Sequence, residues 1–359
     1  MNQRKNIARA TLFGVAFGDS LGKPLEFVAS RDKIRKSGLG YELPLPLGVV
    51  TDDTEMTLAV VRALDSYLTY RPINGKHLSD LEFDLRCEYI AWQDQNVWGR
   101  AAGRTCLRST TNLRKLNRPW QLCTEPLAKG CGANMRVAPI GLVPGWNAED
   151  VANVAQLSAA MTHGHPTALA AAELTALAVY YLRTGECTLD NLTDRLLDRA
   201  YLQRGIYRVD ALGTLADHWR GPKSMHRTQH ARPETVIRAM TFGWNQCVSA
   251  LKVVASGLKK RYDGGDVSLA YGRGWIAEDA LATSVYAASR WSEYPRIALA
   301  QAVRTVGDSD SLGAITGSLL GAALGEDAFP AHWYDRIEYA SELDYYGNLW
   351  DRVAGSALV

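Results

Sequence analysis

The stretch G-D-S-D-S-L-G-A-I-T-G-S-L-L-G-A-A-L-G, residues 307–325, decides the fold. From Gly313 to Gly325 every fourth residue is a glycine, and the residues between them are alanines and aliphatic residues apart from Thr316 and Ser318. Residues four apart lie on one face of a helix, so the pattern predicts a helix with a flat backbone stripe that another helix approaches closely. The two aspartates then stand two residues apart at the start of this rigid element, beside the hydroxyl of Ser311.

The acidic turn fits neither of two better-known motifs. An EF-hand that begins at Asp308 would need an oxygen ligand at its fifth position and a glutamate at its twelfth, which are Leu312 and Leu319 here. A phosphatase of the D-x-D type would need a preceding strand. Residues 297–303, I-A-L-A-Q-A-V, indicate a helix instead.

Helical spacing of apolar residues dominates the rest of the chain. Leu58, Val61, Leu64 and Leu68 form one such stripe, and another runs along residues 168–182. No run shows the sustained alternation, rich in Val, Ile or Thr, of a strand. We therefore expect an all-α fold with a dozen or more helices. Without a flexible linker or internal repeat, residues 1–359 are expected to form a single compact, orthogonal multi-helix domain.

The composition excludes several classes of protein. A chain with 47% hydrophobic and 22% charged residues is typical of a globular protein, and a net charge of +2 gives no footprint for nucleic acid. The six cysteines contain no C-x-x-C pair, which indicates reduced thiols and a cytoplasmic protein. Apolar runs fall short of the roughly 20 residues that cross a bilayer, so no membrane is expected. The basic residues 221–233 suggest an exposed loop.

A second acidic cluster is V-T-D-D-T-E-M, residues 50–56. Thr51 can cap a helix whose first turn holds Asp52 and Asp53. Acids in a first turn commonly offset the helix dipole, which is the simplest interpretation of an isolated pair. Neighbouring residues on a helix also point about 100° apart, so the two carboxylates can address two different cations such as Mg²⁺.

Three further features carry possible chemistry. In G-C-G-A-N-M-R, residues 130–136, two glycines precede a predicted helix and can turn backbone N–H groups toward an anion. Glu26 follows a Gly and Pro turn on a predicted loop. His163 and His165 could suggest a metal site, but without a cysteine partner two histidines are more often local hydrogen-bonding groups.

Taken in this order, the segments resemble the ADP-ribosylglycohydrolase family, whose founding bacterial member reactivates dinitrogenase reductase. The resemblance runs from about Ile7 to about Trp333 and rests on the following ordered set: G-D-S-L-G-K-P-L-E, T-D-D-T, G-C-G-A-N-M-R-V-A-P, T-H, G-R-G-W-I-A-E-D-A-L and G-D-S-D-S-L-G-A. Each element alone is loose, but the set is specific.

The resemblance implies an all-helical fold with two Mg²⁺ or Mn²⁺ ions in a central cleft. The positions that match the family's metal ligands are Thr51, Asp52, Asp53, Asp308, Asp310 and Ser311. Those that match the loop around the diphosphate and the distal ribose are Gly130, Gly132, Ala133 and Asn134, with His163 near the cleft. Glu26 matches a glutamate beside the metals, so Glu26, Asp53 and Asp310 are the candidate catalytic residues. The implied substrate is an ADP-ribosylated protein, with arginine the usual acceptor, and the product is ADP-ribose.

The chain departs from the family pattern at three positions. Ser311 stands where many members have threonine, and Cys131 stands where an asparagine is common. The founding branch has an aspartate in a D-I-G-x-T segment, and the equivalent here is Ala101-Ala102-Gly103-Arg104-Thr105. If that aspartate is the base elsewhere, Glu26 or another acid must serve here.

Two other functions compete with hydrolysis. A Mg²⁺-dependent isoprenoid synthase would need D-D-x-x-D, but Met56 stands at its last position. An immunity protein or pseudoenzyme would bind an ADP-ribosylated target or an ADP-ribosyltransferase without turnover. The complete set of metal ligands argues against a dead site, whereas an immunity protein that hydrolyses would have the same sequence pattern.

Overall fold

The computed structural model describes residues 6–70, 77–95, 99–115, 117–219 and 233–356. The predicted basic loop, residues 221–233, lies outside this part of the chain except for Pro233.

The described residues form helices, with no strand among them and only three isolated β-bridges, so the all-α prediction is confirmed. The α-helices are α1 (Ile7–Gly22), α2 (Arg31–Ser37), α3 (Asp52–Tyr70), α4 (Leu78–Asp94), α5 (Arg104–Leu113), α6 (Ala148–Ala160), α7 (Pro166–Thr184), α8 (Leu192–Leu202), α9 (Val209–Leu212), α10 (Pro233–Leu258), α11 (Val267–Tyr271), α12 (Ala277–Arg290), α13 (Pro295–Val303), α14 (Ser309–Leu324) and α15 (Ala340–Ser356). Short 3-10 turns are η1 (Lys23–Leu25), η3 (Trp120–Leu122), η4 (Cys131–Arg136), η5 (Ala138–Leu142), η6 (Leu215–His218), η7 (Gly325–Ala328) and η8 (Ala331–Trp333). The prediction of one domain over residues 1–359 stays a prediction.

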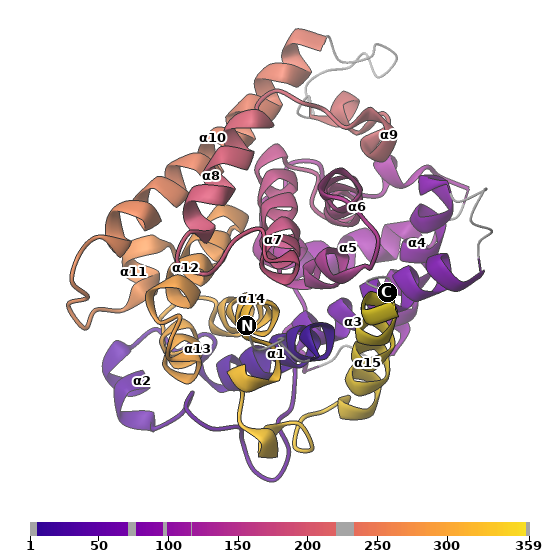
Figure 1. Cartoon of the computed structure of the whole chain (residues 1–359). Helices are drawn as coiled ribbons and strands as arrows, with labels where there is room; N and C mark the ends of the chain where they lie inside the picture. The colour runs from indigo at the N-terminus through magenta and orange to yellow at the C-terminus, as the bar shows by residue number, and fades with distance from the viewer. Residues whose placement is uncertain (1–5, 71–76, 96–98, 116, 220–232, 357–359) are drawn as a thin grey trace.

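Helices α1 and α14 pack backbone against backbone at the centre of the molecule (Figure 1). A Cβ atom on Gly18 would lie 1.9 Å from the carbonyl oxygen of Gly313, and one on Gly317 would lie 1.9 Å from that of Gly14. No side chain fits at such distances, so the predicted glycine stripe is the contact surface of α14. The exception is Gly325, which ends the helix as its C-cap at φ +68°.

The α1–α14 pair is antiparallel, and this direction positions the two acidic ends. Gly18 lies opposite Gly313, and one helical turn further along α1 Gly22 lies against Ser309. The C-terminal end of α1, which leads into η1 and Glu26, therefore meets the N-terminal end of α14 with its two aspartates.

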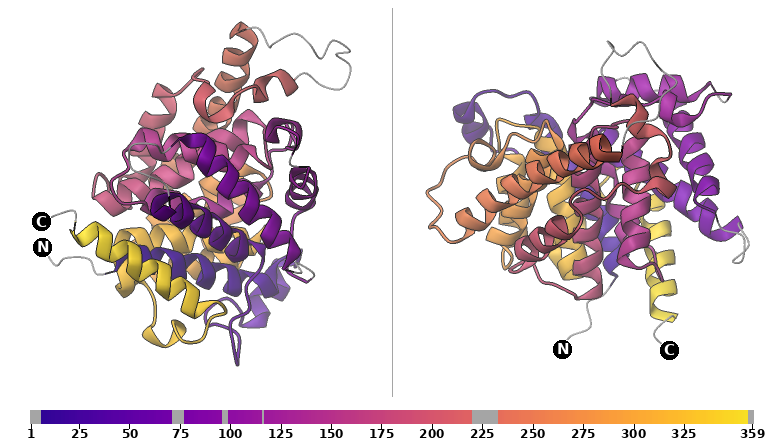
Figure 2. Two further views of the ribbon diagram at one scale, coloured as in Figure 1. Left: turned by 90° about the vertical axis from the view of Figure 1, so that its right-hand side faces the viewer. Right: turned by 90° about the horizontal axis from the view of Figure 1, so that it is seen from above.

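Other helices cover this pair on both sides. Helix α15 packs on α1, and the Asp351 carboxylate accepts hydrogen bonds from the backbone N–H groups of Ala8 and Arg9, 2.8 and 3.0 Å away. These are orphan donors at a helix N-terminus, which need such a partner. Helices α7 and α12 pack on α14, and the stripe predicted in residues 168–182 is buried there. The start of α1 and the end of α15 lie on the same side of the molecule (Figure 2).

The approach to α3 is held by the segment that precedes α15. The N–H of Gly48 donates to Arg336 O at 2.9 Å, and the N–H of Glu338 donates to Gly48 O at 2.9 Å. The Glu338 carboxylate also accepts from the N–H of Val50 and pairs with both Arg100 terminal nitrogens at 2.7 and 2.6 Å. Residues 48–51 therefore enter the site along a fixed path.

The helical prediction for residues 297–303 is confirmed by α13. Among the described residues, no helix has the length and apolar character to span a membrane.

Candidate metal centre

The buried carboxylate of Asp19, near the end of α1, holds the N-terminal turn of α3. It accepts hydrogen bonds from the N–H of Thr51 at 2.9 and 3.0 Å, and from the N–H and hydroxyl of Thr54 at 3.1 and 2.5 Å. Asp19 therefore satisfies donors that a helix N-terminus leaves free, and it fixes the T-D-D-T segment against α1.

Thr51, Asp52 and Asp53 take the predicted places around the start of α3. The N–H of Asp53 donates to the Thr51 hydroxyl oxygen at 3.3 Å, as in an N-cap, and that hydroxyl donates to Asp53 Oδ2 at 3.1 Å. The Asp52 carboxylate accepts from the N–H of Gly103 at 3.4 Å. All three side chains are buried, so these are not the solvated acids of an ordinary first turn.

Asp308 and Asp310 lie at the start of α14, with Asp308 at its N-cap position. The N–H of Asp308 donates to Arg273 O at 2.7 Å, which fixes the turn against the segment before α12. The thiol of Cys131 donates to Asp308 Oδ2 at 2.8 Å and lies 3.7 Å from the Ser311 hydroxyl oxygen. The glycine loop therefore touches the acidic turn directly through the residue that replaces asparagine.

Glu26 closes the cluster from the end of α1. It lies in a turn in which the N–H of Val28 donates to Leu25 O at 3.1 Å. Glu26, Asp308 and Asp310 each offer a carboxylate oxygen, and these three atoms lie within 4.8 Å of one another. The structure thus brings together acids that are 282 and 284 residues apart in the sequence, by the numbers 26, 308 and 310.

The acids share one electrostatic environment. Burial and, next in size, the charge of Asp310 together raise the pKa of Asp19 to about 7 and that of Glu26 to about 9. Burial and the charge of Asp310 also raise the pKa of Asp52, Asp53 and Asp308 well above its ordinary value. Without a cation, so many neighbouring carboxylates cannot all be ionised.

These residues fit divalent cations by their chemistry. Within the described part of the chain, no lysine or arginine forms an ion pair with Asp52, Asp53, Asp308 or Asp310. One oxygen of Asp53, Oδ1, is buried and has no hydrogen-bond partner there. Buried carboxylate and hydroxyl oxygens of this kind are the ligands that Mg²⁺ prefers, and a buried charge needs a counter-charge.

The glycine loop packs against His163. A Cβ atom on Gly132 would lie 2.9 Å from His163 Cε1, and one on Gly130 would lie 3.3 Å from its Nε2. Burial and the charge of Arg136 lower the pKa of His163 to about 3, so the ring is neutral, and its Nδ1 lies 2.9 Å from the Thr162 hydroxyl. His163 therefore lies beside the loop, while His165 caps α7 by accepting from the N–H of Thr167.

The helix predicted after the two glycines is the 3-10 turn η4 rather than an α-helix. Ala133 and Asn134 on it are fully buried, and Asn134 Nδ2 donates to Ala277 O at 3.0 Å. That side-chain nitrogen is used inside the fold, so the backbone is the part of this segment left for an anion. The guanidinium of Arg136 donates to Gly132 O at 2.7 Å and to Ser158 O at 2.8 Å, which fixes the loop.

The segment of residues 100–103 runs along Asp52. Besides the contact from Gly103, the N–H of Asp52 donates to Arg100 O at 3.0 Å, so residues 100–103 flank this acid. Ala101 is exposed and has a φ of +60°. Residue 101 therefore lies in a segment that borders Asp52.

Two residues that organise the site were not among the predicted site residues. Asp19 lies in the G-D-S-L-G motif, and Arg136 follows the glycine loop in an apolar stretch, M-R-V-A-P. A charged residue inside an apolar helical run is the signal for each, because such a charge is rarely buried without partners.

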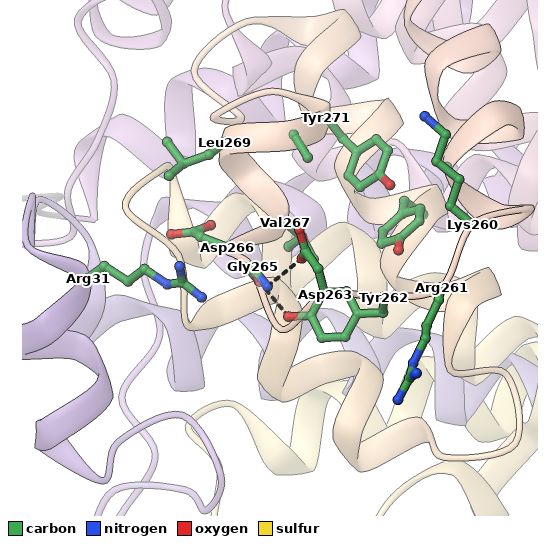
Figure 3. Close-up of a pocket in the computed structure, with 13 residues that line it drawn as sticks. Arg31, Lys260, Arg261, Tyr262, Asp263, Gly265, Asp266, Val267, Leu269 and Tyr271 are labelled. Atoms are coloured by element: carbon green, nitrogen blue, oxygen red, sulfur yellow. Dashed lines mark hydrogen bonds between the residues drawn. The ribbon is translucent and has the colours of Figure 1, made fainter.

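A separate pocket of about 350 Å³ opens between α2 and the segment before α12 (Figure 3). Its lining includes Arg31, Lys260, Tyr262 and Tyr271, and none of the clustered acids. Arg31 donates to Gly264 O across it, so the chain that follows Glu26 is tied to residues 263–275.

The protein therefore belongs to the class of all-helical proteins whose buried carboxylate cluster fits divalent cations. Comparison with known protein families identifies the family within this class. A model of the ADP-ribosylglycohydrolase family matches residues 1–357, so the chain belongs to this family and has the glycohydrolase activity that the family name describes, in general terms.

Similar proteins agree with this placement. An ADP-ribosyl-[dinitrogen reductase] glycohydrolase of Rhodospirillum rubrum is 25% identical over 344 residues, which cover 93% of this chain and 91% of that protein. An uncharacterized protein of Archaeoglobus fulgidus is 24% identical over 344 residues, 93% of each chain. A solved structure titled "ADP-ribosylglycohydrolase-related protein complex" has the same fold, with a TM-score of 0.62 and 20% identity over 99% of this chain and 100% of that one.

Proposed function

We propose that this protein hydrolyses the bond between C1″ of ADP-ribose and a guanidinium nitrogen of arginine on a protein, using two Mg²⁺ or Mn²⁺ ions. The observation that carries the proposal is the meeting of Glu26, Asp308 and Asp310, whose carboxylate oxygens lie within 4.8 Å of one another. The similarity to the Rhodospirillum rubrum glycohydrolase supports the scissile bond.

The residues that would hold the cations are Thr51, Asp52, Asp53, Asp308, Asp310 and Ser311. When bound, divalent cations would supply positive charge that attracts ribose hydroxyls and lowers the pKa of a bound water. Asp53 has a buried oxygen left without a partner in the described residues, and Asp310 raises the pKa of every acid around it. These two aspartates are therefore the ones on which binding depends most.

Glu26 acts as the base. A water oxygen forms a bond to C1″ while the bond from C1″ to the guanidinium nitrogen breaks. Glu26 takes a proton from the water and then gives it to the leaving nitrogen, which restores the Glu26 carboxylate. The transition state resembles an oxocarbenium ion, which a nearby carboxylate also stabilises. The pKa of about 9 that Glu26 has without cations falls as positive charge arrives, toward the value a base needs near neutral pH.

The glycine loop positions the rest of the ligand. Gly130 and Gly132 have no Cβ atom that would press on His163, so the loop packs closely on this ring. The N–H of Cys131 donates to Trp275 O, and other backbone N–H groups of residues 130–134 can face the diphosphate. Burial lowers the pKa of His163, so its ring is neutral and contributes no charge to the glycine loop.

The complete ligand set also bears on the alternatives. A protein that only bound ADP-ribosylated targets or an ADP-ribosyltransferase would not need Glu26 and the whole set of aspartate and hydroxyl ligands in one place. The family membership favours hydrolysis over an isoprenoid synthase. A cytoplasmic location and a biological role in reversing ADP-ribosylation belong to this proposal.

The test uses peptides that carry ADP-ribose on arginine or on serine, with Mg²⁺ or Mn²⁺, and measures free ADP-ribose. We expect release from the arginine peptide by the wild type and a loss of at least about a thousandfold in Asp310→Ala. Equal release by the variant would refute the metal mechanism. No release from any peptide by the metal-loaded wild type would refute hydrolysis.

A further inference from the structure

Two exposed aromatic rings form a stack beside the metal centre. The rings of Phe27 and Trp275 have centroids 5.6 Å apart and planes 18° apart. Phe27 is 72% exposed and Trp275 is 40% exposed, so both rings face solvent rather than the core. Large aromatic side chains gain by burial, and an exposed pair held together therefore suggests a binding surface.

Both rings are attached to backbone that belongs to the site. Phe27 directly follows Glu26, and Trp275 O accepts from the N–H of Cys131 in the glycine loop at 3.3 Å. Two residues before Trp275, Arg273 O accepts from the N–H of Asp308 at 2.7 Å. The hydrogen bond from Arg31 to Gly264 O joins the same two segments a second time. The aromatic pair is thus exposed and attached to two segments that border the buried acids.

The backbone of Phe27 is in a conformation that phenylalanine rarely adopts. Glu26 has φ −54° and ψ 140°, and Phe27 has φ +62°. With the hydrogen bond from Val28 to Leu25, these angles define a type II turn, whose third position normally takes glycine. Strained residues of this kind cluster at functional sites. Phe27 therefore carries an aromatic ring at a turn position that is normally occupied by glycine, which has no side chain.

The chemistry of the rings selects their ligand. Aromatic faces attract cations, and a planar guanidinium also stacks on them. In the described residues, the cationic groups that lie over aromatic rings use other rings, so the outer faces of Phe27 and Trp275 carry no cation of this chain.

The position of the aromatic pair indicates which end of the substrate the two rings would contact. Glu26 would act at C1″, to which the acceptor is bonded, and Phe27 is its neighbour in the chain. The diphosphate would lie along the glycine loop and His163, which the backbone of Trp275 adjoins without its exposed ring being part of the loop. We propose that Phe27 and Trp275 bind the acceptor side chain and select the guanidinium of arginine over a neutral hydroxyl acceptor. This inference rests on the proposed function and adds its acceptor specificity.

The experiment measures kcat and KM for peptides with ADP-ribose on arginine or serine, and the Kd of free ADP-ribose by calorimetry. In Phe27→Ala we expect KM for the arginine peptide to rise about 3- to 30-fold, the size of a cation–π contact, with kcat within about twofold. The Kd of ADP-ribose should stay unchanged. Phe27→Tyr should keep the wild-type KM, and Phe27→Leu, which retains bulk without an aromatic face, should behave like alanine.

Matched controls separate this effect from general damage. Phe83→Ala on α4 removes another exposed ring, 54% accessible, away from the acids, and should change nothing. Trp275→Phe should keep most of the affinity, because it keeps an aromatic face. The proposal is overturned if Phe27→Leu matches the wild type on the arginine peptide, or if Phe27→Ala weakens free ADP-ribose as much as the peptide.

Failure of hydrolysis would remain distinguishable from failure of acceptor recognition. If the wild type releases no ADP-ribose, calorimetry with the uncleaved peptides still compares the arginine and serine acceptors. Tighter binding of the arginine peptide that Phe27→Ala abolishes would support the aromatic pair alone. Equal binding of both peptides by the wild type would overturn it.

Discussion

At the scale of single residues, the site consists of buried carboxylates whose negative charges repel one another and are offset by hydrogen-bond donors and, when bound, by cations. Asp19 is an example. Its carboxylate oxygens accept hydrogen bonds from the N-terminus of α3, and the nearby charge of Asp310 raises the pKa of Asp19. The sequence showed the acids of both clusters. It could not show that Asp19 would cap α3 or that the thiol of Cys131 would reach Asp308, because both contacts depend on how distant segments meet.

The first prediction concerns pH and stability. The pKa is raised from 3.8 to about 7 in Asp19 and from 4.5 to about 9 in Glu26. A carboxyl group whose pKa is higher in the folded state stabilises the fold below its unfolded pKa, and this stability is lost as pH rises through the folded value. We expect the melting temperature of the metal-free protein to fall between about pH 5 and pH 9.

Mn²⁺ should reverse this trend, because bound cations favour the ionised carboxylates and compete with protons. Thermal melts with a chelator and with Mn²⁺ across this pH range measure both effects. A metal-free protein whose melting temperature rises steadily toward pH 9 would contradict the raised pKa values.

The second prediction concerns the base. Glu26→Gln keeps the size of the side chain and removes its basicity, so kcat should fall about 10²- to 10⁴-fold. The resemblance predicts that Ala101 corresponds to an aspartate of the founding branch, and its φ of +60° is one that aspartate tolerates. Adding Ala101→Asp to Glu26→Gln should therefore restore at least about a tenth of the lost rate.

Ala102→Asp in the same background is the control, since it adds the same charge one residue further on. Rate measurements that find equal recovery from both aspartates, or none from Ala101→Asp, would remove the assignment of this position to the site.

At the scale of elements, the glycine spacing of α14 predicted a close helix contact, and the structure confirms it. The partner could have been found as well, because Gly14, Gly18 and Gly22 repeat the same spacing in α1. The η4 turn shows what spacing does not reveal. Its 3-10 geometry accompanies the buried contacts that Arg136 makes with Gly132 and Ser158, and a sequence pattern alone does not contain these partners.

The third prediction concerns this helix pair. In Gly18→Ala the new Cβ would meet backbone atoms of Gly313 and Ala314, so α1 and α14 must separate. We expect a loss of about 3 kcal/mol or more in unfolding free energy, as for severe overpacking, together with weaker Mn²⁺ binding. Gly355→Ala on α15 is the control, because a Cβ atom added there would meet nothing within 4 Å, and it should be neutral or stabilising by up to about 1 kcal/mol.

Denaturant unfolding of the two variants measures the difference. A Gly18→Ala protein as stable as the wild type would show that the helices do not pack as described.

At the scale of the whole molecule, residues from both ends of the chain build one centre. The segment before α15 fixes the path into α3 through Glu338, which pairs with Arg100 and accepts from the N–H of Val50. The ordered motifs predicted which residues gather, since they include both acidic clusters. They did not include residues 336–339, whose role follows only from the folded chain.

The fourth prediction tests this long-range support. Glu338→Gln removes one of the two carboxylates that pair with Arg100, the other being Glu55, and weakens the contact with Val50. The T-D-D-T segment should therefore be less well oriented, and Mn²⁺ affinity should fall about 10-fold. Glu342→Gln is the control, because Glu342 pairs with Arg62 at a similar exposure without touching residues 48–52. Calorimetric titration measures the Mn²⁺ affinity of both variants. Equal Mn²⁺ affinities of Glu338→Gln and Glu342→Gln would show that Glu338 does not support the metal centre.

The most direct test of the central claim is the number of Mn²⁺ ions bound per chain, measured by titrating the metal-free protein. The fifth prediction is two ions in the wild type, and in Asp310→Ala at most one, with lower affinity. Asp32→Ala, which removes an exposed acid on α2, should leave both ions in place. A wild type that binds no Mn²⁺, or an Asp310→Ala variant that binds both ions as tightly as the wild type, would contradict the metal centre.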